Sequence, residues 1–88
     1  MNDKDLQQKL SELHAAIDSV QDVDEEARQL LTHVQQDIQR LLERSSDAEA
    51  HDSLVERLGE SIKQFEITHP ELTWSMGQLI DLLARLGI

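Results

Sequence analysis

Apolar side chains recur every three or four positions along almost all of this 88-residue chain. That spacing is the period of an α-helix that turns one face away from water. Leucine is the commonest of the apolar residues, aromatic residues make up only 2%, and there is a single proline, a composition that favours helices over strands. We therefore predict an all-α protein.

A chain of this length forms one domain, and such a domain buries only about two-thirds of the surface that its unfolded chain exposes. Hydrophobic residues make up 39% of the sequence and charged residues 30%, which is too apolar for a disordered tail. We expect a packed core within a single domain that spans residues 1–88.

The apolar pattern and its interruptions predict four helices, at about residues 3–20, 24–44, 47–67 and 69–86, packed as an antiparallel bundle. Capping-box spacing marks the starts of the second, third and fourth helices, at Asp22 with Glu25, Ser46 with Glu49, and Thr68 with Glu71. Pro70 fits the first turn of the last helix, and Gly87 fits its left-handed stop. The stripe of the first helix is narrow and resembles a coiled-coil seam; it contains Leu6, Leu10, Leu13, Ile17 and Val20.

The break between the second and third helices has an alternative. Residues 45–52 interrupt the apolar pattern but contain no glycine or proline that would force a turn. A continuous helix across this segment would keep a seam with a seven-residue interval. That seam would contain Val20, Ala27, Val34, Leu41, Ala48, Val55 and Ile62.

The fourth helix carries an unusually wide apolar face. At ~100° per residue its apolar side chains cover an arc of about 200°, against roughly 80° for the first helix. Either two neighbouring helices or a second copy of the chain would bury such a face. The residues concerned are Leu72, Met76, Leu79, Ile80, Leu82, Leu83, Ala84 and Leu86.

Four residues of this helix are candidates for contacts outside the monomer. Trp74 falls on the polar side of the helix, so it either contacts a partner or folds over the end of the preceding helix. Gly77 lies in a strip of small residues, which favours a close helix crossing that a larger side chain would block, whereas Gly59 does not require one. Leu82 and Leu86 belong to the wide apolar face.

The formal net charge of −10 argues against nucleic acid or an anionic membrane as a partner, because both would repel the chain. Cysteine is absent, which removes disulfides and thiolate chemistry. The first ten residues are polar, and no run approaches the ~20 apolar residues of a membrane span. We expect a cytoplasmic protein.

No residues form a recognisable catalytic, cofactor or metal site. Glu66 and His69 form one Glu-x-x-His pair, whereas a di-iron bundle needs two such pairs and two further glutamates. The histidines lack metal-ligand spacing and fit surface positions, although His51 falls on the apolar stripe of the third helix, where it would either tune helix pairing near pH 6 or fray with the helix start. No nucleophile elbow or phosphate loop is present. We predict no enzyme activity, no cofactor, no metal and no small-molecule substrate.

The C-terminal third has a recognisable pattern. The pattern consists of Phe65 and Glu66, then His69 and Pro70, then Leu72 and Thr73, and the closing Gly87 and Ile88, with residues 41–44 also familiar; its specific part is Phe65 to Thr73. On these residues the chain resembles the domain-of-unknown-function 4404 family of short proteins. The resemblance implies a bacterial and mostly helical protein, and it transfers no catalytic residue.

Two classes of function remain open from the sequence. The first is a protein-interaction or structural module that self-associates, with a homodimer expected because the fourth helix has surplus apolar surface. The alternative is an acidic regulator that occupies a basic site on a protein partner in the manner of a nucleic-acid mimic, because the net charge is strongly negative.

Overall fold

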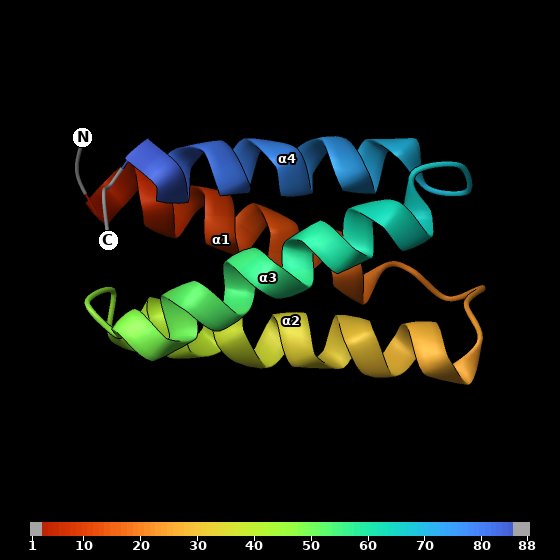
Figure 1. The fold of residues 1–88 in the computed structure, drawn as a ribbon, viewed down its shortest axis with the longest axis horizontal. Helices are drawn as coiled ribbons and strands as arrows, with labels where there is room; N and C mark the ends of the chain where they lie inside the picture. Colours follow the sequence, from red (N-terminus) through yellow and green to blue (C-terminus); the bar gives the residue numbers. More distant parts are fainter. Residues whose placement is uncertain (1–2, 86–88) are drawn as a thin grey trace.

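The computed structural model of the protein describes residues 3–85 and shows four α-helices in that range. They are α1 (Asp3–Asp18), α2 (Glu25–Glu43), α3 (Ala48–Phe65) and α4 (Pro70–Arg85), arranged as a bundle (Figure 1). The all-α prediction and the four predicted helices are confirmed. α1 begins at the predicted residue, Asp3, and the other helix ends lie one or two residues inside the predicted bounds, which is the usual uncertainty of helix ends.

The helices form an antiparallel bundle that follows the order of the chain. Each helix packs against the next one, and α4 completes the ring against α1, whereas the diagonal pairs α1–α3 and α2–α4 have no Cα atoms within 8 Å of each other in the described residues. The molecule is elongated along the helix axes, at 34 × 19 × 19 Å. None of the described helices combines the length and apolarity that crossing a membrane requires.

The chain breaks between α2 and α3, so the alternative of one continuous helix is wrong. Asp47 caps α3, since its Oδ1 accepts a hydrogen bond of 3.0 Å from the Ala50 amide. Arg40 holds the turn from α2, with Nη2 lying 3.2 Å from Asp47 Oδ2 and 3.0 Å from Glu49 Oε1. The Ala50 amide and the Arg40 guanidinium lower the pKa of the Asp47 carboxyl, while the bond to Glu49 raises the pKa of Arg40. Charged side chains thus stabilise the turn between α2 and α3, which contains no glycine or proline.

The predicted capping boxes are wrong in detail. The α2 cap is Asp24, whose Oδ1 accepts from the Ala27 amide at 2.8 Å, and Asp22 lies outside the helix. At α3 the cap is Asp47 and not Ser46. Several adjacent residues in each connection have side chains able to cap, so spacing alone did not select the right one.

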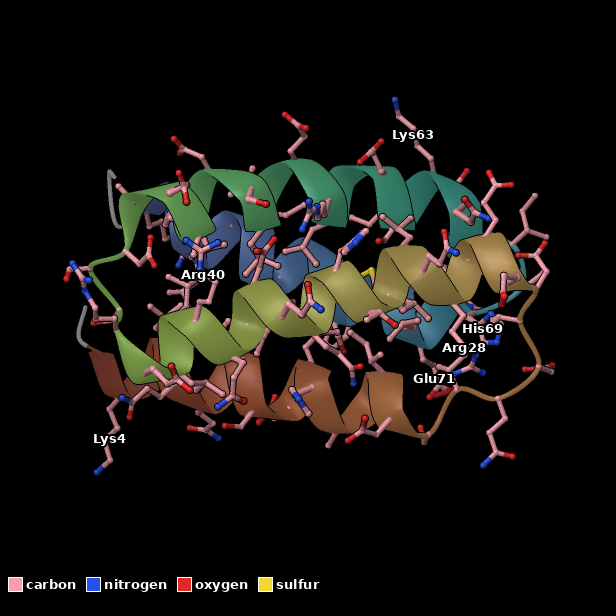
Figure 2. The ribbon with its side chains drawn as sticks, turned by 90° about the horizontal axis from the view of Figure 1, so that it is seen from below. Lys4, Arg28, Arg40, Lys63, His69 and Glu71 are labelled. Carbon is pink, nitrogen blue, oxygen red and sulfur yellow. The ribbon has the colours of Figure 1, made fainter. Side chains whose placement is uncertain are left out.

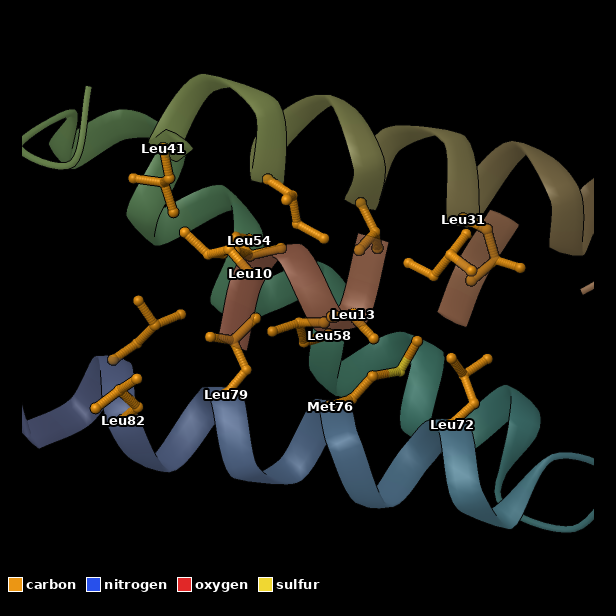
Figure 3. Packing of buried hydrophobic residues seen from close by; sticks show 14 of the residues in the cluster. Leu10, Leu13, Leu31, Leu41, Leu54, Leu58, Leu72, Met76, Leu79 and Leu82 are labelled. Carbon is orange, nitrogen blue, oxygen red and sulfur yellow. The ribbon is translucent and has the colours of Figure 1, made fainter. Parts of the chain in front are cut away.

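One hydrophobic core runs the length of the bundle (Figure 3). The predicted stripe of α1 supplies four fully buried residues, and Val20 is partly buried beyond the helix end. Two neighbours, α1 and α3, cover most of the wide face of α4, so its buried residues need no second copy to leave water, while Ile80 is partly buried and Ala84 is exposed. The buried residues of α4 are Leu72, Met76, Leu79, Leu82 and Leu83.

Candidate interaction surface on helix 4 and its junction with helix 3

His69 joins the α3–α4 connection to the α1–α2 connection at one end of the bundle (Figure 2). Its Nε2 lies 3.4 Å from Asp22 Oδ1, and its Nδ1 lies 2.9 Å from Thr68 Oγ1. The ring also packs edge-on against Phe65, with 5.6 Å between the ring centroids and 79° between the planes. One side chain at the junction therefore connects two segments that are 47 residues apart in the sequence.

The start of α4 differs from the predicted capping box. Pro70 lies in the first turn, as predicted, and is the first helical residue, and the His69 carbonyl accepts from the Thr73 amide at 3.2 Å. The Thr68 hydroxyl contacts the His69 ring instead of capping the helix. Glu71 therefore has no capping partner at Thr68.

Thr68, His69 and Asp22 stand in the order hydroxyl, imidazole and carboxylate, which is also the order of a nucleophile, its base and the group that orients the base. Catalysis needs in addition a site that excludes water and stabilises a developing charge. The Asp22 side chain is 90% exposed, so water competes for its carboxylate. We interpret the three side chains as a structural connection between the two loops.

Trp74, the only tryptophan, is 67% exposed in the first half of α4. It borders a shallow hollow with Pro70, Glu71 and Ser75, and its indole N–H has no hydrogen-bond partner in residues 3–85. The side chain thus does not fold over the end of α3 as a core residue would. Ile67, in the connection before α4, is the other large apolar side chain that is exposed in this range, at 88%.

The structure places the other three candidate residues, Gly77, Leu82 and Leu86, in different environments or outside its described range. A Cβ built on Gly77 would meet no atom within 4 Å, so the close helix crossing predicted at this glycine is wrong within the chain. A Cβ built on Gly59 would also meet no atom within 4 Å, and no crossing was predicted there. Leu82 is only 9% exposed and belongs to the hydrophobic core instead of a contact surface. Leu86 lies outside the described residues.

A regular line of side chains faces solvent along α4. We define this outer stripe as Glu71, Trp74, Gln78, Asp81 and Arg85, which follow one another at intervals of three, four, three and four residues. Gln78 is half-buried and the other four are exposed. None of the three charged residues of the stripe forms an ion pair within residues 3–85, whereas Arg40 and Arg57 are both paired. The stripe thus carries charges and an aromatic ring that the monomer does not use.

The buried carboxylate of Asp37 was not recognised from the sequence. Asp37 on α2 is 2% exposed; its Oδ2 accepts from Ser53 Oγ at 2.8 Å and from Arg57 Nη1 at 3.2 Å, both on α3. The signal was available, because Asp37 falls on the same helix face as the apolar Val34 and Leu41. This cluster bridges the two helices and is far more enclosed than an ordinary surface pair.

His51 is buried, at 4% exposure, and the fraying predicted for this position is wrong. Its Nε2 lies 3.3 Å from the Leu83 carbonyl oxygen, which connects the first turn of α3 with α4. Because a carbonyl only accepts, Nε2 carries the proton in this contact. Nδ1 has no hydrogen-bond partner among the described residues, and the nearest carboxylate oxygen, Asp52 Oδ1, is 3.7 Å away.

Titratable side chains gather nowhere into a metal-binding arrangement in residues 3–85, where no three His, Cys, Asp or Glu residues converge. Glu66 is exposed, and the partners of His69 are Thr68 and Asp22. The pair Glu66 and His69 therefore does not act as a unit in this structure.

Fold and surface together define a small acidic four-helix bundle with a packed core and an outer stripe on α4 whose charged residues form no ion pair within residues 3–85. The chain belongs to the family described as Domain of unknown function (DUF4404), whose model matches residues 6–88. No curated protein and no solved structure matches the chain. The predicted family resemblance is thereby confirmed, and the family description assigns no activity.

Proposed function

We propose that this protein is a protein-interaction module, and that its contact surface is the outer stripe of α4. The observation that carries the proposal is the exposure of Trp74, a residue type that proteins normally bury and that is enriched at the energetic centres of interfaces. The bundle buries eighteen apolar residues in its core but leaves its single tryptophan exposed to water. This contrast supports a role for the indole ring in a contact with another molecule.

The surroundings of Trp74 support the same interpretation. Glu71 precedes it on the outer stripe and Asp81 follows beyond Gln78, and both offer carboxylates that no cation of the described chain neutralises. An aromatic anchor rimmed by polar and charged groups is the usual composition of a contact patch. Ile67 adds a second exposed apolar side chain in the connection that leads into α4.

The proposal is tested by quantitative capture of binding proteins from an extract of the native organism on the immobilised chain, with Trp74→Ala as the variant. His33→Ala is the matched control, because it removes an exposed ring from α2, the helix diagonal to α4. Loss of an interface tryptophan costs about 2 kcal/mol or more, so bound protein should fall roughly thirtyfold for Trp74→Ala and stay unchanged for His33→Ala. Equal capture by all three chains would refute the proposed surface.

The acidic-regulator alternative predicts a different salt response. Capture driven by a net charge of −10 weakens steeply as salt is added, whereas capture through an aromatic anchor weakens little. The same experiment at two ionic strengths therefore separates the two functions.

A further inference from the structure

The outer stripe of α4 is complementary to itself when two copies run in opposite directions. Its acidic end is Glu71, its basic end is Arg85, and Gln78 lies midway between them. Two such stripes laid antiparallel about Gln78 bring each Glu71 opposite the Arg85 of the other copy. We propose that the occupant of this surface is a second copy of the chain, bound through α4 about a two-fold axis that passes beside Gln78.

The charges select the antiparallel orientation. In a parallel pair of the same stripes, Glu71 would face Glu71, Asp81 would face Asp81 and Arg85 would face Arg85, so that every charged contact would be repulsive. In the antiparallel pair the two Glu71–Arg85 contacts are attractive, and no acid of the stripe faces another acid. Neither residue has an ion pair within residues 3–85, so no internal contact must be broken first.

The tryptophan fits the same register. Trp74 lies four residues before Gln78, and Asp81 lies three residues after it, so the antiparallel pair sets each indole opposite the Asp81 of the other copy. The indole N–H, which has no partner in the described chain, is a donor, and the Asp81 carboxylate accepts. Gly77, beside the stripe, has no atom within 4 Å of a built Cβ, which leaves room for the second helix.

The size of the contact makes the pair weak. At ~1.5 Å per residue the stripe from Glu71 to Arg85 is roughly 21 Å long, and one helix pair covers less than the ~800 Å² per partner of a standard interface. The wide apolar face of α4 adds nothing, because α1 and α3 already cover it. We therefore expect a reversible dimer that forms only above roughly 10 μM protein.

The inference rests on the proposed contact surface and is tested with two charge reversals, Glu71→Arg and Arg85→Glu. Each variant alone places like charges in both end contacts of its own dimer, whereas an equimolar mixture restores opposite charges in both end contacts of the heterodimer. Sedimentation equilibrium should show self-association weakened at least about tenfold in each variant and recovered to within about threefold in the mixture. A general charge effect predicts otherwise, because Glu71→Arg makes the chain less acidic and would strengthen association.

Trp74 provides a second readout that does not depend on the variants. Trp74 is the only tryptophan, so it is the source of the tryptophan fluorescence of the protein. Acrylamide should quench this fluorescence at low protein concentration, where Trp74 is exposed, and quench it less at high concentration, where the second copy covers the ring. Equal circular dichroism and thermal unfolding of all chains show that the reversals leave the fold intact. Unchanged quenching over the concentration range in which the wild type sediments as a dimer would overturn the α4 pairing.

The outcomes also separate this inference from the proposed function. A wild type that stays monomeric up to about 1 mM overturns the pairing, but a loss of captured protein in Trp74→Ala would still uphold the contact surface. A dimer that is indifferent to Trp74→Ala overturns the pairing as well. A dimer that Trp74→Ala weakens, but that the mixture of charge reversals does not restore, refutes the antiparallel register.

Discussion

The Asp37–Arg57 contact offers the sharpest test of how the bundle is held together. The Asp37 side chain is 3% exposed, the Arg57 side chain is 32% exposed, and their closest atoms are 3.2 Å apart. Besides Arg57, the carboxylate accepts from Ser53, and Arg40 lies 3.9 Å away. One partner is thus enclosed and the other reaches water, so the two truncations should have unequal costs.

The magnitude follows from that inequality. Arg57→Ala leaves a buried carboxylate with Ser53 as its main partner, and we expect a loss of about 2–3 kcal/mol in the free energy of unfolding. Asp37→Ala leaves a guanidinium that water can solvate, and we expect about 1–2 kcal/mol. The double variant should lose less than the sum, with a coupling energy of about 1–2 kcal/mol that lies between the values of exposed and fully buried pairs.

Urea denaturation followed by far-ultraviolet circular dichroism measures all four chains of this cycle. Lys63→Ala is the control, because it removes an exposed base from the same helix that has no ion pair in the described residues; its stability should change by less than about 0.5 kcal/mol. Costs that add to within about 0.5 kcal/mol would refute the reasoning, as would a larger cost for Asp37→Ala than for Arg57→Ala.

Three further predictions concern the core, the glycines and the α3 cap. Leu58→Ala empties a fully buried position and should lower the free energy of unfolding by about 2–5 kcal/mol in the same urea assay; a loss below 1 kcal/mol would contradict the core. Gly59→Ala and Gly77→Ala meet no atom within 4 Å and should each raise stability by about 0.5–1 kcal/mol, whereas a lower melting temperature would reveal contacts that the structure lacks. The pKa of Asp47 is lower in the folded chain than its ordinary value of 3.8, so its stabilising contribution is present above that value and is lost as the pH falls through the lower folded value. Asp47→Ala should therefore reduce stability at neutral pH and flatten the decline in melting temperature as the pH falls below 3.8, and an unaltered acid decline would contradict the cap.

The N-caps of α2 and α3 show which structural detail could not be predicted from the sequence. The sequence placed a helix start near residue 24 and another near residue 47, and both are confirmed. It selected Asp22 and Ser46 as capping residues, whereas Asp24 and Asp47 cap the helices. The free energy differences among neighbouring capping side chains are a few tenths of a kcal/mol, so contacts from elsewhere in the fold decide among them. At α3 such a contact comes from Arg40, which pairs with Asp47 from the preceding helix.

Two of the buried polar residues, Asp37 and His51, illustrate the same limit for the helix faces. His51 and Asp37 both lie on apolar stripes, and helical periodicity alone cannot tell whether such a residue is tolerated at a frayed end or enclosed with a partner. The partners, the Leu83 carbonyl and the Arg57 guanidinium, lie 32 and 20 residues away. Only the packing of α3 against α2 and α4 brings them into contact.

The sequence by itself determined the helical class and the apolar stripe that each helix turns inward, because burying apolar side chains on a 3.6-residue repeat is a local property of the chain. The break between α2 and α3, and with it the number of helices, was decided by the tertiary structure. From the sequence, either two neighbouring helices or a second copy of the chain could bury the wide face of α4. In the tertiary structure α1 and α3 pack against it. In the same packing arrangement Leu82 is buried in the core and Trp74 remains exposed to water. Which side chains remain for a partner depends on which neighbours a helix acquires, and that is settled only when distant segments pack.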